Sequence, residues 1–347
     1  MAGGSGGTSS RDALAKERGR LRAALLGLSG VGAEYAAALR ADDRFELVGA
    51  ADRDADLLRE RSEALGCEGY SDFRSLVVEN ARQGLDILFV ALPPHESHEF
   101  VALAARHSVG VFHPPPFARS VTEGRQLLAE FENAGVSLVV ERRWQHDPAF
   151  AKLQTASHLI GRVFGATATV RVEEKPAGWR GDARRAGGGV LLNHAYRALD
   201  LLTFLMGMPD EVYAQAILGV PPGASRPYDT EDLACLTLRY PEDRAASLAV
   251  VRGACPAESS IWIVGEQGAM AVDDVQLKVF LGGGGGQTYR VAARHPAAPA
   301  ISALAESLLE GTATASKAQE HLGVLAVIEA AYLSARTGAP ETPGKFL

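Results

Sequence analysis

A glycine-rich turn near the N-terminus follows an apolar run and precedes a helical pattern. Residues 27–32 read Gly-Leu-Ser-Gly-Val-Gly. Glycines let a backbone turn tightly and approach a pyrophosphate, whose charge then lies at the N-terminus of the next helix. Ser29 replaces the middle glycine of G-x-G-x-x-G, and a glycine is displaced to Gly30. We expect Gly27, Ser29, Gly30, Val31 and Gly32 to bind a dinucleotide; the alternative is an ordinary strand-to-helix turn.

Asp52 lies about twenty residues beyond this loop, directly after an apolar run. A carboxylate at that place accepts hydrogen bonds from an adenosine ribose and repels a 2′-phosphate, which favours NAD over NADP. Arg53 weakens the preference, because a guanidinium can stack on adenine or pair with a phosphate. The residues therefore predict NAD as the cofactor, with NADP as the alternative.

Apolar runs alternate with helical patterns before residue 143. We expect strands at residues 21–26, 45–51, 85–92, 110–113 and 136–140, and helices at 33–40, 55–65, 100–107 and 123–134. Strands alternating with helices predict a doubly wound α/β domain, a parallel sheet with right-handed crossovers.

The pattern changes after Trp144. We expect a helix at 148–160, a strand at 165–172, a polar loop at 173–185, a glycine run at 187–189 and a helix at 190–206. Further strands are expected at 211–217, 232–240, 245–252, 260–264, 270–272 and 276–281, then a solvated hairpin turn at 282–286 and a last helix at 319–335. The second half is predicted to be an α+β domain with a mostly antiparallel sheet.

Composition excludes several classes of protein. The 347 residues carry 42 acidic and 35 basic side chains, a net charge of −7, which argues against a nucleic-acid-binding protein. The three cysteines form no C-x-x-C pair, so neither a disulfide framework nor a metal site is expected. No apolar run is long enough to span a bilayer, and the N-terminus has no hydrophobic signal core. We expect a cytoplasmic protein.

Several short motifs together resemble the glucose–fructose oxidoreductase, inositol dehydrogenase and rhizopine-catabolism (Gfo/Idh/MocA) family of NAD(P)-dependent oxidoreductases. They are GLSGVG at 27–32, VGAADR at 48–53, ALPPHESH at 91–98, VFHPPPFA at 111–118, WR at 179–180, GGGVLLNHAYRALD at 187–200 and VIEAAYLSARTG at 327–338. The resemblance covers nearly everything after the N-terminal tail. It implies a Rossmann domain, an open-faced sheet domain, an active site between them, and homodimers or homotetramers formed through the sheet.

The chain departs from the family where protons are handled. Family members carry Glu-Lys-Pro after the fifth strand, and here residues 114–116 are all proline, so Pro115 replaces the lysine. They also carry Asp and His four apart on a helix, where this chain has Asn193 and Arg197. Helical spacing still puts both side chains on one face, where they can bind and polarise a substrate oxygen. Neither can act as a base, because an amide does not titrate and guanidinium stays protonated.

Four other side chains are candidates for the proton transfer, and water is a further alternative. His113 precedes the lost lysine position, and the alternative is a packed, hydrogen-bonded histidine. His194 follows Asn193, and a buried structural histidine is the alternative. Tyr196 can donate a proton or contact substrate, or pack in the core. Lys175 lies in a literal Glu-Lys-Pro triplet, but after a second-domain strand, and the alternative is a solvated loop lysine.

The resemblance also suggests contacts with cofactor and substrate. Leu92, Pro93, His95 and His98 follow the fourth strand, and Trp179 and Arg180 resemble a segment close to the cofactor. Arg143 is a candidate for substrate binding, with a surface ion pair as the alternative. We expect Asp200 to be structural.

Together these features predict an NAD(P)-dependent oxidoreductase acting on a sugar, polyol or related small metabolite with non-standard acid/base residues. The alternative is a non-redox member, either a cofactor-binding scaffold or sensor, or an enzyme doing other chemistry such as imine reduction. The expected divisions are a disordered tail at 1–20, a Rossmann domain at 21–143 and a substrate and oligomerisation domain at 144–347. The last helix is expected to pack back on the first domain.

Overall fold

The computed structural model describes residues 18–146, 152–153, 157–219, 227–273, 276–290, 297–312 and 318–347. These residues form two compact units. Among the described residues, unit 1 comprises 18–117, 125–143, 297–312 and Ala318, and unit 2 comprises 118–124, those between 144 and 290, and 319–347. The helix expected at 148–160 lies mostly outside the described residues.

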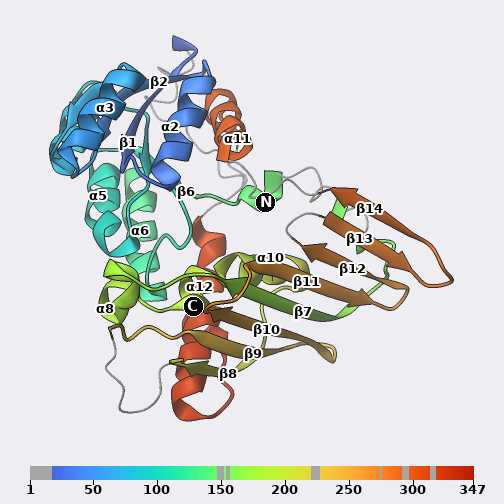
Figure 1. Cartoon of the computed structure of the whole chain (residues 1–347). Coiled ribbons are helices and arrows are strands. Elements are labelled where there is room, and N and C mark those ends of the chain that lie inside the picture. Colours follow the sequence, from blue (N-terminus) through green and yellow to red (C-terminus); the bar gives the residue numbers. More distant parts are fainter. Residues whose placement is uncertain are drawn as a thin grey trace. The chain divides into compact units, whose positions relative to one another are not determined.

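Unit 1 contains a six-stranded sheet in the order β3-β2-β1-β4-β5-β6, and all its pairs are parallel (Figure 1). Its strands are β1 (Leu21–Leu26), β2 (Phe45–Ala51), β3 (Glu68–Tyr70), β4 (Ile87–Val90), β5 (Gly110–His113) and β6 (Leu138–Val140). The helices are α2 (Val31–Ala41), α3 (Ala55–Leu65), α4 (Phe73–Arg82), α5 (Pro94–Arg106) and α11 (Ala297–Glu310), together with α6 (Val121–Ala134), which belongs to unit 1 from Arg125 onward. The predicted doubly wound fold is confirmed, and its strand order reverses beside β1, where such folds bind ligands.

Helices cover both faces of this sheet because adjacent residues of a strand point to opposite sides. Ala50 of β2 belongs to the core formed with α2 and α11. Its neighbour Gly49 faces the other way, where an added Cβ would lie 3.2 Å from the Asn80 side chain of α4. The core between α2 and the sheet contains edge-to-face aromatic pairs of Tyr35 with Phe89 and Phe112.

Helix α11, late in the chain, belongs to unit 1. Ile301 of α11 is fully buried in the same core as Tyr35 of α2. The last helix, α12 (Ala318–Thr337), belongs to unit 2 from Gln319 onward. Glu329 of α12 accepts a hydrogen bond from the Val121 N–H at the start of α6. An apolar helical pattern does not specify which of two cores it will join, and the return of α11 to unit 1 was not predicted.

Unit 2 contains an eight-stranded sheet in the order β14-β13-β12-β11-β7-β10-β9-β8. Its strands are β7 (Val163–Val172), β8 (Glu211–Ile217), β9 (Leu233–Tyr240), β10 (Arg244–Arg252), β11 (Glu258–Gly265), β12 (Gly268–Asp273), β13 (Gln276–Leu281) and β14 (Gly286–Arg290). Only the β7–β10 pair is parallel, so the predicted mostly antiparallel sheet is confirmed. The glycine run after β13 makes the expected hairpin turn to β14.

One face of this sheet is covered and the other is open. Along β9 buried and exposed residues alternate strictly, as expected for a sheet packed on one side. The covered face packs on α10 (Tyr196–Met206), and Ser334 of α12 accepts a hydrogen bond from the backbone of Ala214. On the open face Trp262 and Phe280 stack at 5.5 Å, and each is more than 40% exposed.

Several boundaries differ from those expected. Residues 190–206 form two helices, α9 (Val190–Asn193) and α10, separated at His194 and Ala195. The supposed loop at 173–185 contains the 3-10 turn η2 (Gly178–Gly181) and the start of α8 (Ala183–Ala186). Helix α5 begins at Pro94, because proline fits the first position of a helix, where its missing N–H costs nothing. Short 3-10 turns occur at Arg143–His146 and Pro343–Lys345.

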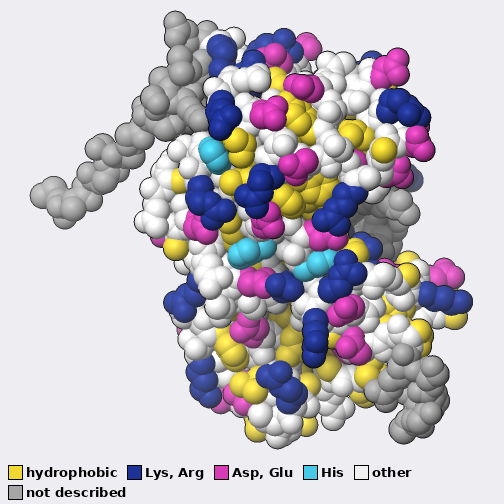
Figure 2. Space-filling model, turned by 90° about the vertical axis from the view of Figure 1, so that its left-hand side faces the viewer, with side chains coloured by type: hydrophobic (Ala, Val, Ile, Leu, Met, Phe, Trp, Pro, Cys, Tyr) yellow, Lys and Arg dark blue, Asp and Glu magenta, His cyan; other side chains and the backbone are white. Residues whose placement is uncertain are grey.

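The surface carries both signs of charge. Figure 2 shows Lys and Arg interspersed with Asp and Glu over the face in view, without a large area of one sign. Within the described ranges, no helix combines the length and the hydropathy needed to cross a membrane.

Candidate functional site

The loop between β1 and α2 has the geometry of a phosphate-binding turn. Gly27 and Gly30 adopt positive φ angles of 86° and 52°. A Cβ on Gly32 would lie 2.0 Å from the carbonyl oxygen of Gly27, so only glycine lets the helix approach the strand this closely. Gly30 precedes α2 and provides no side-chain cap. Among the described residues, the backbone N–H groups of Ser29, Gly30 and Val31 have no partner, and they can bind an anion.

Asp52 is fixed beside this loop. Its Oδ2 accepts a hydrogen bond of 2.7 Å from the Leu28 N–H, and its Oδ1 accepts one of 3.0 Å from the Asp54 N–H. Each carboxylate oxygen can accept a further hydrogen bond, so Asp52 can still accept hydrogen bonds from ribose hydroxyls. Cofactor binding by the loop and Asp52 therefore fits the residues present.

The Arg53 side chain already contacts a carboxylate and an aromatic ring, so it does not act as a simple phosphate partner. Its Nη1 lies 3.2 Å from the Glu96 carboxylate, and its guanidinium lies over the Phe73 ring, 5.6 Å from the centroid. Glu96 offsets the positive charge that would attract a 2′-phosphate. Nε2 of His95 lies 3.4 Å from the other Glu96 oxygen. This arrangement favours NAD over NADP.

The segment after β4 leads from the sheet into the next helix. Leu92 and Pro93 are half-buried, and Pro93 precedes the first turn of α5, which contains His95 and His98. Nδ1 of His98 is buried and has no hydrogen-bond partner among the described residues. His98 therefore retains the capacity for one further hydrogen bond on this turn.

His113 has no accessible nitrogen for catalysis. The side chain is buried at the end of β5, with Nδ1 2.6 Å from the Pro114 carbonyl oxygen and Nε2 2.9 Å from Ser97 Oγ. These partners require Nδ1–H to donate to Pro114 and Nε2 to accept from the serine. Burial lowers the pKa of His113 to about 4, so the ring is neutral. The catalytic role is wrong, and the packed, hydrogen-bonded histidine is confirmed.

This histidine makes stability depend on pH. Its folded-state pKa of about 4 lies below the ordinary 6.5, so the unfolded chain binds a proton that the folded chain refuses. Stability is therefore lost as the pH falls from 6.5 towards 4, by about 2 kcal/mol between pH 7 and pH 5. Urea unfolding at both pH values should show a smaller difference in His113→Gln, whereas the control His107→Gln keeps it. An unchanged difference in His113→Gln would refute this explanation.

Arg143 is an ion-pair partner in unit 1. Its guanidinium contacts the carboxylates of Glu34 and Glu141, the second at 2.8 Å. Glu141 is buried after β6, where burial raises its pKa, and it accepts a hydrogen bond of 2.9 Å from the Tyr35 hydroxyl. Arg143 is only 20% exposed, so the pair is more enclosed than a surface bridge. The substrate-binding assignment of Arg143 gains no support from these contacts.

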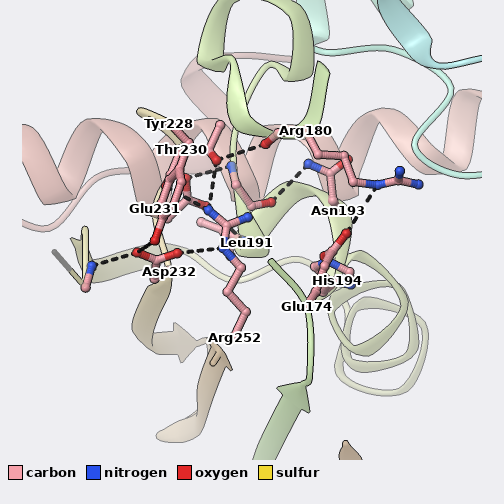
Figure 3. Close-up of polar contacts among 12 residues, drawn as sticks. Glu174, Arg180, Leu191, Asn193, His194, Tyr228, Thr230, Glu231, Asp232 and Arg252 are labelled. Atoms are coloured by element: carbon pink, nitrogen blue, oxygen red, sulfur yellow. Dashed lines mark hydrogen bonds and ion pairs between the residues drawn. The ribbon is translucent and has the colours of Figure 1, made fainter. Parts of the chain in front are cut away.

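Glu231 organises the glycine run of unit 2. Its carboxylate accepts a hydrogen bond of 3.0 Å from the N–H of Leu191 (Figure 3). It also accepts hydrogen bonds from the N–H of Gly189 at 2.6 Å and from the Tyr332 hydroxyl at 2.8 Å. A Cβ on Gly188 would lie 2.0 Å from that hydroxyl, and one on Gly189 would lie 2.3 Å from the Glu231 carbonyl oxygen. The glycines are therefore required by close packing. The same contacts fix the start of α9.

Beside Glu231, a buried ion pair fixes the adjacent strands. Arg252 Nε lies 2.6 Å from Asp232 Oδ1, and both side chains are buried. Arg252 also donates to the carbonyl and hydroxyl of Thr230, whose hydroxyl donates to the Arg180 carbonyl (Figure 3). This network connects β9 and β10 to the segment that contains Trp179 and Arg180.

The Asn193 amide is oriented by its backbone neighbours. Its Nδ2 donates hydrogen bonds of 3.0 Å to the carbonyl oxygens of both Gly188 and Gly189. Two carbonyl partners require the nitrogen to face them, so Oδ1 is the atom left to accept a hydrogen bond. Asn193 can therefore accept a hydrogen bond from a substrate hydroxyl, but it has no N–H left to donate to a substrate carbonyl and polarise it.

Asn193→Asp, which restores the family residue, should destabilise this protein. A carboxylate oxygen would lie where Nδ2 is now, 3.0 Å from two carbonyl oxygens. We expect a loss of about 2 kcal/mol in the free energy of unfolding at pH 7, measured in urea. Asn193→Ala removes the same bonds without adding charge and should cost less. Equal or higher stability of Asn193→Asp would show that these carbonyls do not select the amide.

His194 forms a pair with Glu174. Its Nε2 lies 2.5 Å from Glu174 Oε2, while Arg180 Nε lies 3.6 Å from the other carboxylate oxygen (Figure 3). The hydrogen bond from His194 lowers the pKa of Glu174, and Arg180 and Arg252 add to this effect, against the opposing effect of burial. The His194 side chain is 24% exposed, so the predicted buried histidine is wrong. The break between α9 and α10 is the reason.

The remaining candidates lie in different surroundings. Tyr196 is buried, and its hydroxyl lies 3.1 Å from Nδ1 of the fully buried His321, so packing in the core is confirmed. Asp200 is structural, because it is buried and accepts a hydrogen bond of 2.9 Å from Trp144 Nε1. The side chains of Lys175, Arg180 and Arg197 are exposed, and the Arg180 guanidinium lies over the Trp179 ring at 4.5 Å.

Two family models match the chain. The model described as the oxidoreductase family with an NAD-binding Rossmann fold matches residues 21–142, and the GFO/IDH/MocA C-terminal domain matches residues 150–271. The chain belongs to the Gfo/Idh/MocA family of oxidoreductases. The predicted family, the NAD cofactor and the enzyme class are thereby confirmed.

Individual relatives illustrate the range of this family. Myo-inositol 2-dehydrogenase of Thermotoga maritima is 25% identical over 74% of this chain and 76% of that protein. A 2,7-anhydro-N-acetylneuraminate hydratase of Mediterraneibacter gnavus is 27% identical over 61% of this chain and 57% of that protein. An oxidoreductase from Agrobacterium radiobacter, solved with NAD+, L-tartaric acid and magnesium, superposes with a TM-score of 0.81 at 20% identity. The match covers 94% of this chain and all of that one, and it shows a shared fold.

Glu174 and Glu231 were missed as site residues by sequence reasoning. Glu174 lies twenty positions before His194, and Glu231 lies forty-two after Gly189. Periodicity and motif spacing reveal nothing about partners so far apart in a chain. The only available signal for Glu174 was the literal Glu-Lys-Pro triplet, which drew attention to Lys175.

Proposed function

We propose that this family member oxidises a hydroxyl group of a sugar, polyol or related small metabolite, with NAD as hydride acceptor and acid/base residues unlike those typical of the family. The observation that carries the proposal is the β1–α2 loop, where unpaired N–H groups lie beside the fixed carboxylate of Asp52. This arrangement suits a dinucleotide pyrophosphate and an adenosine ribose.

In this proposal each group acts according to its surroundings. Oδ1 of Asn193 accepts a hydrogen bond from a substrate hydroxyl, and Arg197 attracts an anionic or strongly polar group of the substrate. Leu92, Pro93, His95 and His98 border the nicotinamide end of the cofactor. In unit 2, Trp179 and Arg180 stack on each other and offer the cofactor an aromatic and cationic surface. Lys175 is exposed and takes no part.

A second candidate is chemistry that yields no net oxidation. The support is that Pro115, Asn193 and Arg197 replace all three of the family's usual proton-handling residues. A relative named as a hydratase is consistent with such chemistry on this fold. Imine reduction and a cofactor-binding sensor are further alternatives to alcohol oxidation, since neither requires removal of an alcohol proton.

Turnover of a panel of compounds separates these functions. The full chain is incubated with NAD+ and sugars, polyols or sugar acids, and both NADH fluorescence and substrate loss are followed. We expect at least one hydroxyl compound to be consumed with an equal amount of NADH formed. Consumption of a compound with no NADH formed would contradict the oxidation and favour the second candidate.

We also propose that copies of the chain associate through the open face of the eight-stranded sheet. The exposed and stacked Trp262 and Phe280 support this, because large apolar side chains on a flat sheet favour association. Light scattering measures the mass in solution, and a monomer at all concentrations would contradict it.

A further inference from the structure

We propose that His194 accepts the substrate's hydroxyl proton and that Glu174 positions and stabilises it for this step. The inference rests on the proposed oxidation. It assigns to one imidazole the role that the family positions, here occupied by Pro115, Asn193 and Arg197, cannot fill.

The contact with Glu174 determines which nitrogen is basic. Glu174 Oε2 lies 2.5 Å from Nε2 of His194, and an ionised carboxylate can only accept a hydrogen bond there. Nε2 therefore carries the proton, and Nδ1 carries the lone pair. Within the described part of the chain, Nδ1 makes no hydrogen bond, and the side chain is 24% exposed. The lone pair is available to a ligand.

The helix break places His194 in this position. The N–H groups of both His194 and Ala195 hydrogen-bond to the Val190 carbonyl, at 2.9 and 3.0 Å. The second is an i to i−5 bond, which interrupts the regular helix, and α10 restarts at Tyr196. A continuous helix would have directed His194 to the face of the buried Ala198 and Leu201. The interruption leaves the imidazole half-exposed beside Asn193.

Glu174 places an ionised carboxylate against the ring nitrogen opposite the one that accepts the proton. Glu174 contributes a negative charge at Nε2, and its ionised state is maintained by the His194 hydrogen bond and by Arg180 and Arg252. A carboxylate that holds one imidazole nitrogen stabilises the imidazolium that forms when the other accepts a proton. Asn193 Oδ1 can accept a hydrogen bond from a second hydroxyl of the substrate and so help to align it.

The other candidates do not fulfil these conditions. Both ring nitrogens of His113 are bonded inside unit 1, and the Tyr196 hydroxyl is buried against His321. Lys175 is exposed and has no contact that would hold it beside Asn193 among the described residues. His194 combines a fixed orientation with an accessible lone pair.

The step balances as an ordinary alcohol oxidation. The hydroxyl O–H bond breaks and its proton moves to His194 Nδ1, while the C–H bond on the same carbon breaks and a C=O bond forms. The β1–α2 loop and Asp52 would hold NAD+, which would supply the acceptor for the hydride and its electron pair. The alcohol is oxidised to a carbonyl compound, NAD+ is reduced to NADH, and His194 later releases its proton to solvent.

The test compares three variants of the full chain on the panel compound that the wild type oxidises fastest. We expect His194→Gln to lower kcat/KM by about 10²–10⁴-fold, the usual contribution of a positioned base. Glu174→Gln should lower it by at least about tenfold, and it should move the acid limb of the pH profile to lower pH, because the imidazolium loses its counter-charge. His107→Gln, a half-buried histidine outside the site, should match the wild type. NADH affinity and urea unfolding are measured for all three variants.

Each outcome decides between the proposals. The proposed roles of His194 and Glu174 are supported by two results together. His194→Gln loses most of its kcat/KM while it retains NADH affinity, and the acid limb of the pH profile moves to lower pH in Glu174→Gln. If the wild type oxidises a panel compound and His194→Gln has the same kcat/KM, this inference is overturned and the proposed oxidation stands. An unmoved acid limb in Glu174→Gln overturns the positioning role. A wild type that oxidises no panel compound while binding NADH overturns the proposed function and this inference with it.

Discussion

Gly32→Ala is expected to weaken NADH binding by about 10- to 100-fold and to lower the free energy of unfolding by about 1–3 kcal/mol. The added Cβ would lie 2.0 Å from the Gly27 carbonyl oxygen and 3.2 Å from the Ala91 Cβ. The closest atom belongs to the backbone, so relief requires the loop or α2 to move. Either movement displaces the N–H groups of Gly30 and Val31 from their present positions.

A fluorescence titration with NADH measures this effect, alongside urea unfolding. Gly253→Ala is the matched control, because a Cβ there meets nothing within 4 Å and its φ is not positive. The control should bind NADH as the wild type does. Unchanged NADH affinity in Gly32→Ala would mean that the loop does not bind the cofactor or that it tolerates the displacement.

Glu231→Gln is expected to lower the free energy of unfolding by about 3 kcal/mol and to reduce turnover while NADH affinity is retained. The carboxylate accepts three hydrogen bonds, from Gly189, Leu191 and Tyr332. An amide nitrogen cannot accept, so at least one buried donor loses its partner. The affected segment leads directly to Asn193 and His194, whereas the nucleotide loop belongs to unit 1.

The measurements are urea unfolding, NADH titration and kcat on the same compound. Tyr332→Phe is the control for this network, because it removes a single hydrogen bond and should cost about 1 kcal/mol. If Glu231→Gln were as stable as Tyr332→Phe, the carboxylate would not be the group that holds the glycine run.

The Rossmann half could be predicted well because its signals are local. The apolar run before Gly27, the glycines and Asp52 specify strand, turn, helix and strand within a short segment. The contacts of Asp52 with Leu28 and Asp54 then agree with the expected site. The packing of α11 on the core of unit 1 could not be predicted, because its apolar face could have packed against either core.

The second half of the site depends on contacts between distant residues. Helical spacing predicted a continuous helix through His194 and therefore a buried side chain, whereas the chain breaks there and exposes it. The break follows from hydrogen bonds to the Val190 carbonyl and from Glu231 fixing the preceding turn. Asn193 was recognised by its position, but the carbonyl partners that orient its amide were not visible in the sequence.

The central claim is that unit 1 binds a pyridine dinucleotide on the β1–α2 loop. Calorimetric titration of the purified full chain with NADH and NADPH tests it most directly, with Asp52→Ala titrated in parallel. We predict one NADH per chain, weaker binding of NADPH, and a marked loss of NADH affinity in the variant. No heat of binding with either nucleotide, or equal NADH affinity in Asp52→Ala, would contradict the account.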